Sequence, residues 1–315
     1  ALTMEIGRET LIRFVRAVLK RNGYNISSDE FRSPAYDMIA SNDENIFIIK
    51  VLYNVDTLKN DVANEIRLIA KLIKANPLII GVRCAIGYLE DSILYTRYDV
   101  PVLSFKTFVN YINREELPIG FAAPGGFYVK IEPKKLREAR ERKRVSIGDL
   151  AKEANVSRRS IQLYEEGNTA VSIDVVLKIE NYLNVNLIER IDPFEKLPEP
   201  EEKFLMPKDE LGKNAMEAFK RAGYRIYFTK KTNFDALSSL MEDVLFIGFT
   251  RLKEEVILKA RIIEEIAYLT EKYGLLITNN ESVGKNIPTV NIKDLLNTDE
   301  ETMKTIILEK KFRNF

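Results

Sequence analysis

The chain of 315 residues contains no histidine and only one cysteine. Without histidine, neither a Ser-His-Asp nor a Cys-His catalytic arrangement can form, and imidazole metal ligands are excluded. Cys84 stands in the apolar stretch LIIGVRCAIGYL and is expected to be a small core residue. A single cysteine cannot form an internal disulfide, which fits a reducing cytoplasm.

Long apolar runs are also absent. No segment reaches the roughly 18 uninterrupted apolar residues of a membrane span, and the first ten residues, ALTMEIGRET, lack the apolar region of a signal peptide. We therefore expect a cytoplasmic protein that does not contact a membrane. Hydrophobic residues make up 45% of the chain, so a buried core is expected. The net charge is only +1, so a nucleic-acid interface would need locally clustered basic residues.

The sequence repeats one order of elements at long range. Each copy has an amphipathic helix ending at glycine (Gly23, Gly223), then a turn and a strand centred on an aspartate (Asp37, Asp235). An apolar strand, a long helix, another apolar strand and a closing strand–helix segment come next. In the two copies the first apolar strand begins at 46 and 244 and the long helix at 63 and 259. The second apolar strand begins at 78 and 275, and the closing segment at 100 and 287. The repeat predicts two related α/β domains.

Glycine and proline mark the boundaries between segments. The stretch LPIGFAAPGGF at 117–127 ends the first α/β domain, and 192–210 contains four prolines, typical of a semi-rigid linker or a surface strap. We predict an α+β multidomain chain with a central all-α module of four or five helices. The expected segments are an N-terminal α/β domain (1–122), the helical module (123–190), a linker (191–210) and a related C-terminal α/β domain (211–315).

Residues 133–185 have the pattern of a helix-turn-helix module. The first helix is expected from about Pro133 to Lys143, and the fourth from Ile173 to Leu183 with a core of Val176, Leu177 and Leu183. Between them, Ser146 and Ser157 are predicted helix caps, Asn155 takes the corner in a left-handed conformation, and Gly167 ends the third helix. Such a pair of helices presents the second one to the major groove of duplex DNA.

The side chains predicted to face outward have the chemistry of base recognition. Arg158 and Arg159 can each bond guanine with a guanidinium fork, and Gln162 can pair with adenine. Phosphate contacts are predicted for Lys134, Arg137, Ser146, Ser157 and Ser160. The segment 133–144 carries seven Lys or Arg and two Glu, a net charge of +5, which suits either a phosphate-facing helix or a solvated amphipathic one.

The stretch SIGDLAKEANVSRRSIQLYEEGNTAVSIDVVLKI resembles the Cro/lambda-repressor type of helix-turn-helix at LA, the V-S corner, I, YE-x-G and LKI. More widely, GGFYVKI leading to LREAR and SIGDLA in mid-chain resembles an archaeal family of HTH-type transcriptional regulators. This resemblance implies a transcriptional role and brings no ligand with it.

The helix–strand–strand–helix–strand order of the flanking domains resembles the restriction-endonuclease-like fold of Holliday-junction resolvases. That resemblance implies an active site with an aspartate followed by an acidic-x-Lys triplet that holds Mg²⁺. Asp37 and Lys50 stand at such positions, but Ile48 takes the acidic one, and the second copy has Phe246-Ile247-Gly248. Glu65 is an alternative carboxylate. We expect a degenerate fold that does not cleave.

The sequence favours a sequence-specific regulator that binds double-stranded DNA as a homodimer. One alternative is a factor that binds RNA or a ribonucleoprotein, and another is a Mg²⁺-dependent nuclease. No phosphate-binding loop is present, since Gly125-Gly126 is only a tight turn. We therefore predict no catalytic residue, no bound metal and no cofactor, and the sequence identifies no effector.

Overall fold

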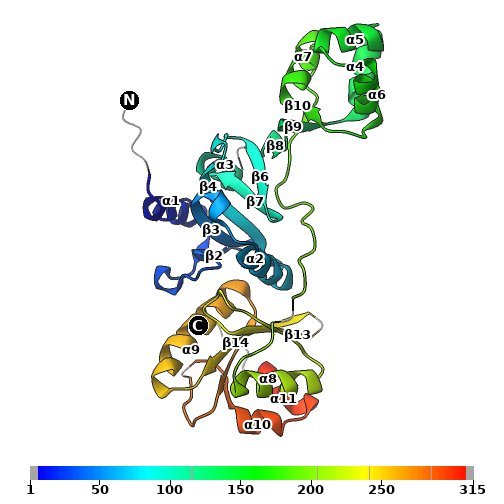
Figure 1. Ribbon diagram of the computed structural model, residues 1–315. Coiled ribbons are helices and arrows are strands. Elements are labelled where there is room, and N and C mark those ends of the chain that lie inside the picture. The colour runs from blue at the N-terminus through cyan, green and yellow to red at the C-terminus, as the bar shows by residue number, and fades with distance from the viewer. Residues whose placement is uncertain (1–5, 115, 204, 241, 285, 310–315) are drawn as a thin grey trace. The chain divides into compact units, whose positions relative to one another are not determined.

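The structure is a computed structural model that describes residues 6–114, 116–203, 205–240, 242–284 and 286–309. Its contacts form two compact units (Figure 1). The first comprises Ala1–Val51, Leu58–Leu78 and Pro198–Phe315, and the second Leu52–Thr57 and Ile79–Leu197. Within the described ranges, no helix is both long and apolar enough to cross a membrane. The four segments expected from the sequence remain a prediction.

The first unit contains elements from both copies of the repeat. Those of the first copy are α1 (Arg8–Arg21), β1 (Asn25–Ile26), the short 3-10 helix Asp29–Phe31, β2 (Met38–Ser41), β3 (Ile46–Asn54) and α2 (Asn60–Ile73). Those of the second copy are α8 (Glu210–Arg221), β12 (Arg225–Phe228), β13 (Ala236–Leu240), β14 (Asp243–Thr250), α9 (Lys253–Thr270), β15 (Tyr273–Thr278), β16 (Thr289–Asn291), α10 (Ile292–Leu296) and α11 (Glu300–Glu309). The helices and strands of the two copies thus follow the same order.

Strand pairing repeats as well. β1, β2 and β3 pair antiparallel in sequence order, and so do β12, β13 and β14. Further along the chain, β4 (Asn76–Cys84) pairs parallel with β7 (Val100–Ser104), and β15 pairs parallel with β16. Both first helices end before a glycine with positive φ, at 81° for Gly23 and 84° for Gly223, where a side chain would be strained. The prediction of two related α/β folds is confirmed in topology.

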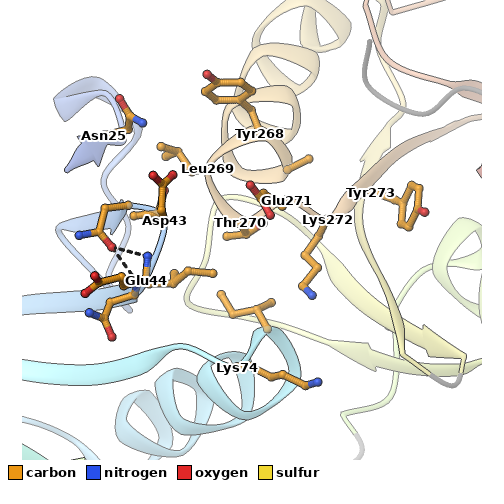
Figure 2. Close-up of a pocket in the computed structure, with 16 residues that line it drawn as sticks. Asn25, Asp43, Glu44, Lys74, Tyr268, Leu269, Thr270, Glu271, Lys272 and Tyr273 are labelled. Atoms are coloured by element: carbon orange, nitrogen blue, oxygen red, sulfur yellow. Dashed lines mark hydrogen bonds between the residues drawn. The ribbon is translucent and has the colours of Figure 1, made fainter. Parts of the chain in front are cut away.

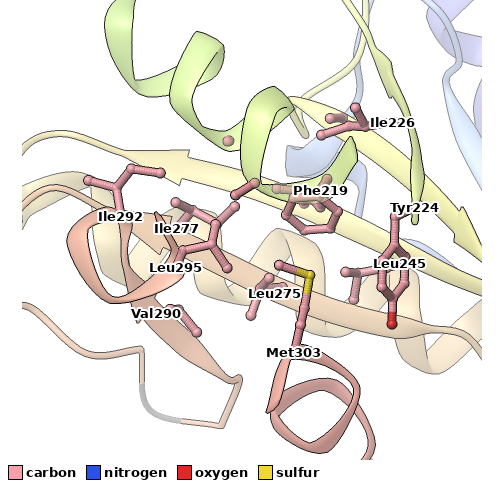
Figure 3. Packing of buried hydrophobic residues seen from close by; sticks show 14 of the residues in the cluster. Phe219, Tyr224, Ile226, Leu245, Leu275, Ile277, Val290, Ile292, Leu295 and Met303 are labelled. Carbon is pink, nitrogen blue, oxygen red and sulfur yellow. The ribbon is translucent and has the colours of Figure 1, made fainter. Parts of the chain in front are cut away.

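One of the apolar clusters of the C-terminal copy packs the sheet against α8, α10 and α11 (Figure 3). Phe219 of α8 is fully buried, and its ring meets that of Tyr224 edge-on at 5.7 Å between centroids. Leu245 and Leu275 contribute from the neighbouring strands β14 and β15, and Met303 of α11 joins the same cluster. Alternating residues of the sheet therefore pack against helices on one face, as expected for an α/β domain.

The second unit contains the rest of the first α/β fold and the helical module. Its elements are the 3-10 helix Val55–Thr57, β4 (Asn76–Cys84), β5 (Gly87–Tyr88), β6 (Ile93–Arg97), β7 (Val100–Ser104), α3 (Phe105–Ile112), β8 (Gly120–Ala123), β9 (Gly126–Ile131), α4 (Pro133–Arg142), α5 (Ile147–Ala154), α6 (Arg158–Glu166), β10 (Val171–Ser172), α7 (Ile173–Leu183) and β11 (Ile188–Glu189). The strand order is β4-β7-β6-β8-β9-β10, with β5 paired to β4 and β11 to β9. The short strands β10 and β11 thus join the helical module to β9.

Helices α4 to α7 surround a small core of their own. Leu136, Leu150, Ile161 and Val176 are each completely buried, one from each helix. The α7 core differs from the expectation at one residue. Leu177 is 52% exposed, and Ile179 is buried in its place. Positions 176, 179 and 183 fall on one face of a helix with 3.6 residues per turn, whereas position 177 lies about 100° away from 176.

From Pro198 on, the proline-rich segment belongs to the first unit and lies along helix α2. Arg67 of α2 donates hydrogen bonds of 2.9 Å to the carbonyl oxygens of Pro198 and Glu199. Asn64 donates to the carbonyl of Glu201 at 3.1 Å, and Lys71 forms an ion pair with Glu199 at 2.6 Å. Because Asn64, Arg67 and Lys71 share one face of α2, this part of the segment is a surface strap.

Candidate nucleic-acid interface

Local hydrogen bonds fix both ends of α5 and α6. The Ser146 hydroxyl accepts from the backbone N–H of Asp149, and the Ser157 hydroxyl from that of Ser160, each at 3.0 Å. Asn155 adopts the left-handed conformation with φ 54°, and Gly167 ends α6 with φ 77°. These residues set the corner between the two helices, as the sequence predicts, and thereby fix which residues of α6 face outward.

A buried ion pair joins α4 to α6. The Glu165 carboxylate has a side-chain exposure of 4% and accepts from Nε and Nη2 of Arg140 at 2.6 and 3.2 Å. Arg140 also donates to the carbonyl of Val145, and its own side-chain exposure is 12%. Glu165 raises the pKa of the Arg140 guanidinium through this hydrogen bond. Sequence reasoning missed the pair, although the YE-x-G pattern contains Glu165.

Helix α6 also carries the three residues predicted to reach bases. Arg158, Arg159 and Gln162 are all exposed. Arg159 lies 3.5 Å from Glu166 in an ion pair along the helix. Arg158 has no ion-pair or hydrogen-bond partner among the described residues, and its guanidinium lies against Gly148 in the first turn of α5. The three side chains therefore share the solvent-facing side of one short helix.

The dipole of α6 does not favour two arginines at this place. Arg158 and Arg159 are the first two residues of α6, and no acidic residue accompanies them in that turn. Positive charge at a helix N-terminus opposes the helix dipole, at a cost of about 0.3–1 kcal/mol for an exposed group. Their placement therefore needs an explanation other than helix stability, and contact with an anionic partner supplies one.

The residues predicted to contact phosphates differ in how free their side chains are. The Lys134 side chain is 80% exposed with only a loose 3.8 Å contact to Glu138, and Arg137 is 53% exposed and 3.6 Å from Glu165. The serine hydroxyls already have internal partners. Ser146 donates to the Asp149 carboxylate at 2.6 Å, and the hydroxyls of Ser157 and Ser160 lie 2.9 Å apart. Ser146 and Ser157 cap helices, so a phosphate contact by either would share a capping hydroxyl.

Of the seven basic residues between 133 and 144, Arg140 is internal, and the others are exposed. The buried side of α4 consists of Leu136 and Ala139. The burial pattern fits an amphipathic helix, and the phosphate-facing role remains a prediction. One cation serves the core, and the remaining six form an exposed basic surface.

The aspartate expected at a nuclease-like centre is buried in the first unit. Asp37 is 2% exposed, and its Oδ2 accepts from the backbone N–H of Val51 at 2.7 Å. Its Oδ1 is bonded by Arg8, which also donates to the Val51 carbonyl at 2.9 Å. Lys50 instead donates to the carbonyl of Pro34 at 2.8 Å, and burial lowers the pKa of its ammonium group. Both carboxylate oxygens of Asp37 therefore stabilise the backbone and an arginine.

Comparison with known proteins agrees with both parts of this architecture. Residues 8–118 match the family model of the PD-(D/E)XK superfamily domain, and residues 136–189 match that of the helix-turn-helix. A protein of Methanocaldococcus jannaschii is 36% identical over 94% of this chain and 95% of its own length, and one of Thermoplasma acidophilum is 33% identical over 98% and 100%. Both are named "Putative HTH-type transcriptional regulatory protein".

The chain belongs to this family of archaeal HTH-type transcriptional regulatory proteins. The family resemblance and the nuclease-like fold expected of the N-terminal domain are thereby confirmed. A relative from Methanococcoides burtonii, 33% identical over 98% of this chain, carries the same name. No solved structure matches the chain.

The C-terminal copy of this regulator keeps the aspartate and replaces the lysine. Asp235 accepts from the backbone N–H of Phe249 at 2.7 Å, as Asp37 does from Val51. Lys259 of α9 donates to Asp235 at 3.0 Å, and its stem lies over Gly248, where a Cβ would be 2.7 Å from Lys259 Cγ. The cation at the aspartate thus comes from α9 in this copy and from Arg8 of α1 in the first copy. In the sequence, Gly248 at the lysine position of the triplet indicates that the strand carries no cation there.

The remaining carboxylate considered for a metal site is also occupied. Glu65 is 7% exposed, and its two oxygens accept from the backbone N–H groups of Lys230 and Lys231 at 2.6 and 2.7 Å. Burial raises the pKa of this carboxyl group. Within the described ranges, no three or more Asp, Glu or Cys side chains gather as metal ligands. The residues present therefore do not fit the Mg²⁺ site that the PD-(D/E)XK fold implies.

A hollow of about 840 Å³ lies in the first unit (Figure 2). The β2–β3 turn contributes Asp43 and Glu44, and the end of α9 with the residues after it contributes Tyr268, Glu271 and Lys272. The charges on its wall are mixed. The arrangement has no paired catalytic groups and no cluster of one sign, so it does not identify a ligand.

Because the part of the nuclease-like fold that the structure describes lacks the ligands for a Mg²⁺ site, we expect that the protein does not cleave DNA. Incubation of the full chain with linear and branched duplexes in Mg²⁺ or Mn²⁺ is expected to leave the substrates intact on a denaturing gel, because no group of three or more metal-ligating side chains occurs among the described residues. Cleavage that is lost in Asp37→Asn and survives in Lys178→Ala, an exposed control on α7, would overturn this expectation.

Proposed function

We propose that this regulator binds double-stranded DNA sequence-specifically, with α6 in the major groove. The observation that carries the proposal is the exposed set of Arg158, Arg159 and Gln162 on a helix whose last turn is tied to α4 by the pair of Glu165 with Arg140. Arginine forks and glutamine amides match the edges of guanine and adenine, and each good bidentate pair contributes about 1–3 kcal/mol of discrimination. The exposed basic residues of α4 supply the attraction to phosphates.

The same proposal includes a homodimer. Proteins with this kind of helix-turn-helix bind two half-sites about 34 Å apart, one helical turn of DNA, with matching two-fold symmetry in protein and operator. The α/β domains are then non-cleaving parts that support the pair of modules. Palindromic recovered sites and a dimer mass in solution would support this arrangement, and a single unrepeated site bound by a monomer would contradict it.

The test is selection of bound duplexes from a randomised library by the full chain. One enriched motif is expected, and its affinity should fall steeply with salt. If Lys134 and Arg137 of each protomer contact one phosphate each, the logarithm of the association constant falls with the logarithm of the salt concentration with a slope of about −3.6 or steeper. Enrichment of no duplex, or stronger binding of a structured RNA in direct competition, would refute the DNA-binding proposal and favour the RNA alternative.

A further inference from the structure

The arginine at the start of α6 rests on a glycine of the preceding helix. A Cβ built on Gly148 would lie 3.0 Å from both Nε and Nη2 of Arg158 and 3.2 Å from its Cζ. These distances are shorter than ordinary contacts, so any larger residue at position 148 would displace the guanidinium. The missing side chain is therefore what allows Arg158 to lie flat on α5.

The backbone does not explain a glycine at this position. Gly148 lies within α5 and is not among the glycines with positive φ. The three atoms nearest to a Cβ at this position all belong to the Arg158 side chain. Glycine inside a helix is less favourable than alanine or leucine. Position 148 thus lowers the stability of α5, and the close approach of Arg158 gives a reason for it.

The two neighbouring arginines are consequently held in different ways. The Arg159 guanidinium pairs with Glu166 at the last position of α6, while that of Arg158 rests on the first turn of α5. A long side chain held in one place loses less conformational entropy when it binds. The Arg158 fork is therefore prepositioned between the two helices of the motif, although it is exposed and unpaired among the described residues.

We infer that Gly148 is a positioning residue for DNA specificity. It determines where the Arg158 guanidinium lies when it forms hydrogen bonds with a guanine. This inference rests on the proposed function. It assigns to Gly148 no DNA contact of its own, so every effect of changing it should pass through Arg158. It also predicts that specificity at one base pair depends on a residue outside α6.

The experiment uses the full chain and the duplex recovered from the randomised library. The base pair whose preference disappears in Arg158→Ala is identified first. Gly148→Leu is then expected to lower the affinity ratio between that base pair and its substituted version about fivefold or more, the lower end for a bidentate arginine contact. Gly148→Ala, which moves the guanidinium less, should lie between wild type and Gly148→Leu. The matched control on the same helix is Glu153→Ala, which should leave the ratio unchanged.

A double-mutant cycle distinguishes positioning from a structural role. In the Arg158→Ala background, Gly148→Leu should lower the affinity for the selected duplex no further, and the thermal midpoint of either Gly148 variant should equal or exceed that of wild type. An unchanged ratio in Gly148→Leu alone, or an equal loss of affinity with and without Arg158, would overturn the inference while leaving sequence-specific binding intact. Failure to recover any duplex would instead refute the proposed function and this inference with it.

Discussion

Replacement of both Arg158 and Arg159 by alanine is expected to reduce binding of the selected duplex to the level of random DNA. Each arginine–guanine pair contributes about 1–3 kcal/mol, so each substitution should cost roughly fivefold to 150-fold in specific affinity. The fold should be unaffected, because both side chains are exposed and oppose the dipole of α6. Electrophoretic mobility shifts with selected and random duplexes, together with thermal unfolding, measure the two effects.

The matched controls are two other exposed cations. Lys134→Ala, on α4, should weaken binding to selected and random duplexes alike and make the salt slope shallower by about one unit per lost contact. Lys178→Ala, on α7, should change neither. If the double arginine variant still distinguished the selected duplex from random DNA, α6 could not be the helix that reads the bases.

Features set by short-range chemistry could be predicted from the sequence. The caps at Ser146 and Ser157, the left-handed Asn155 and the glycine ends of helices depend on residues within a few positions, and the structure has each of them. The repeated order of strands and helices was also predictable, because each element carries its own apolar period. The surface position of the α6 side chains follows from the same helical period.

Contacts between distant side chains could not be predicted in the same way. Arg140 and Glu165 are 25 positions apart, and Asp235 and Lys259 are 24 apart. Each pair requires the relative rotation of two elements, which a single sequence does not fix. The wrong assignment of Leu177 to the core has the same origin, since neighbouring positions of α7 differ in direction by about 100°.

The two copies indicate how a nuclease-like fold can persist without a metal site. In each copy an aspartate before the second strand accepts from a backbone N–H 14 positions later, and a cation pairs with its carboxylate. Arg8 supplies that cation in one copy, and Lys259 in the other. A carboxylate paired with a cation and a backbone donor is satisfied without Mg²⁺. The aspartate can thus be retained for stability alone.

Truncation of Glu165 should have the largest effect on the helical module. Glu165→Ala would leave the Arg140 guanidinium, only 12% exposed, without its charged partner, and breaking a buried ion pair in this way costs about 3–5 kcal/mol. The loss is a large part of the 5–15 kcal/mol that stabilises a typical domain. Hydrogen exchange of the α4 and α6 amides in the full chain, followed by mass spectrometry, measures the local opening free energy.

Two further variants separate the ion pair from simple packing. Glu166→Ala, at the exposed neighbouring position, should change the opening free energy by no more than about 0.5 kcal/mol. Arg140→Met combined with Glu165→Leu should recover most of the stability, because apolar residues of similar size can replace a buried pair. A loss below about 1 kcal/mol in Glu165→Ala would mean that water satisfies Arg140, and α6 would then be held in place by its apolar residues alone.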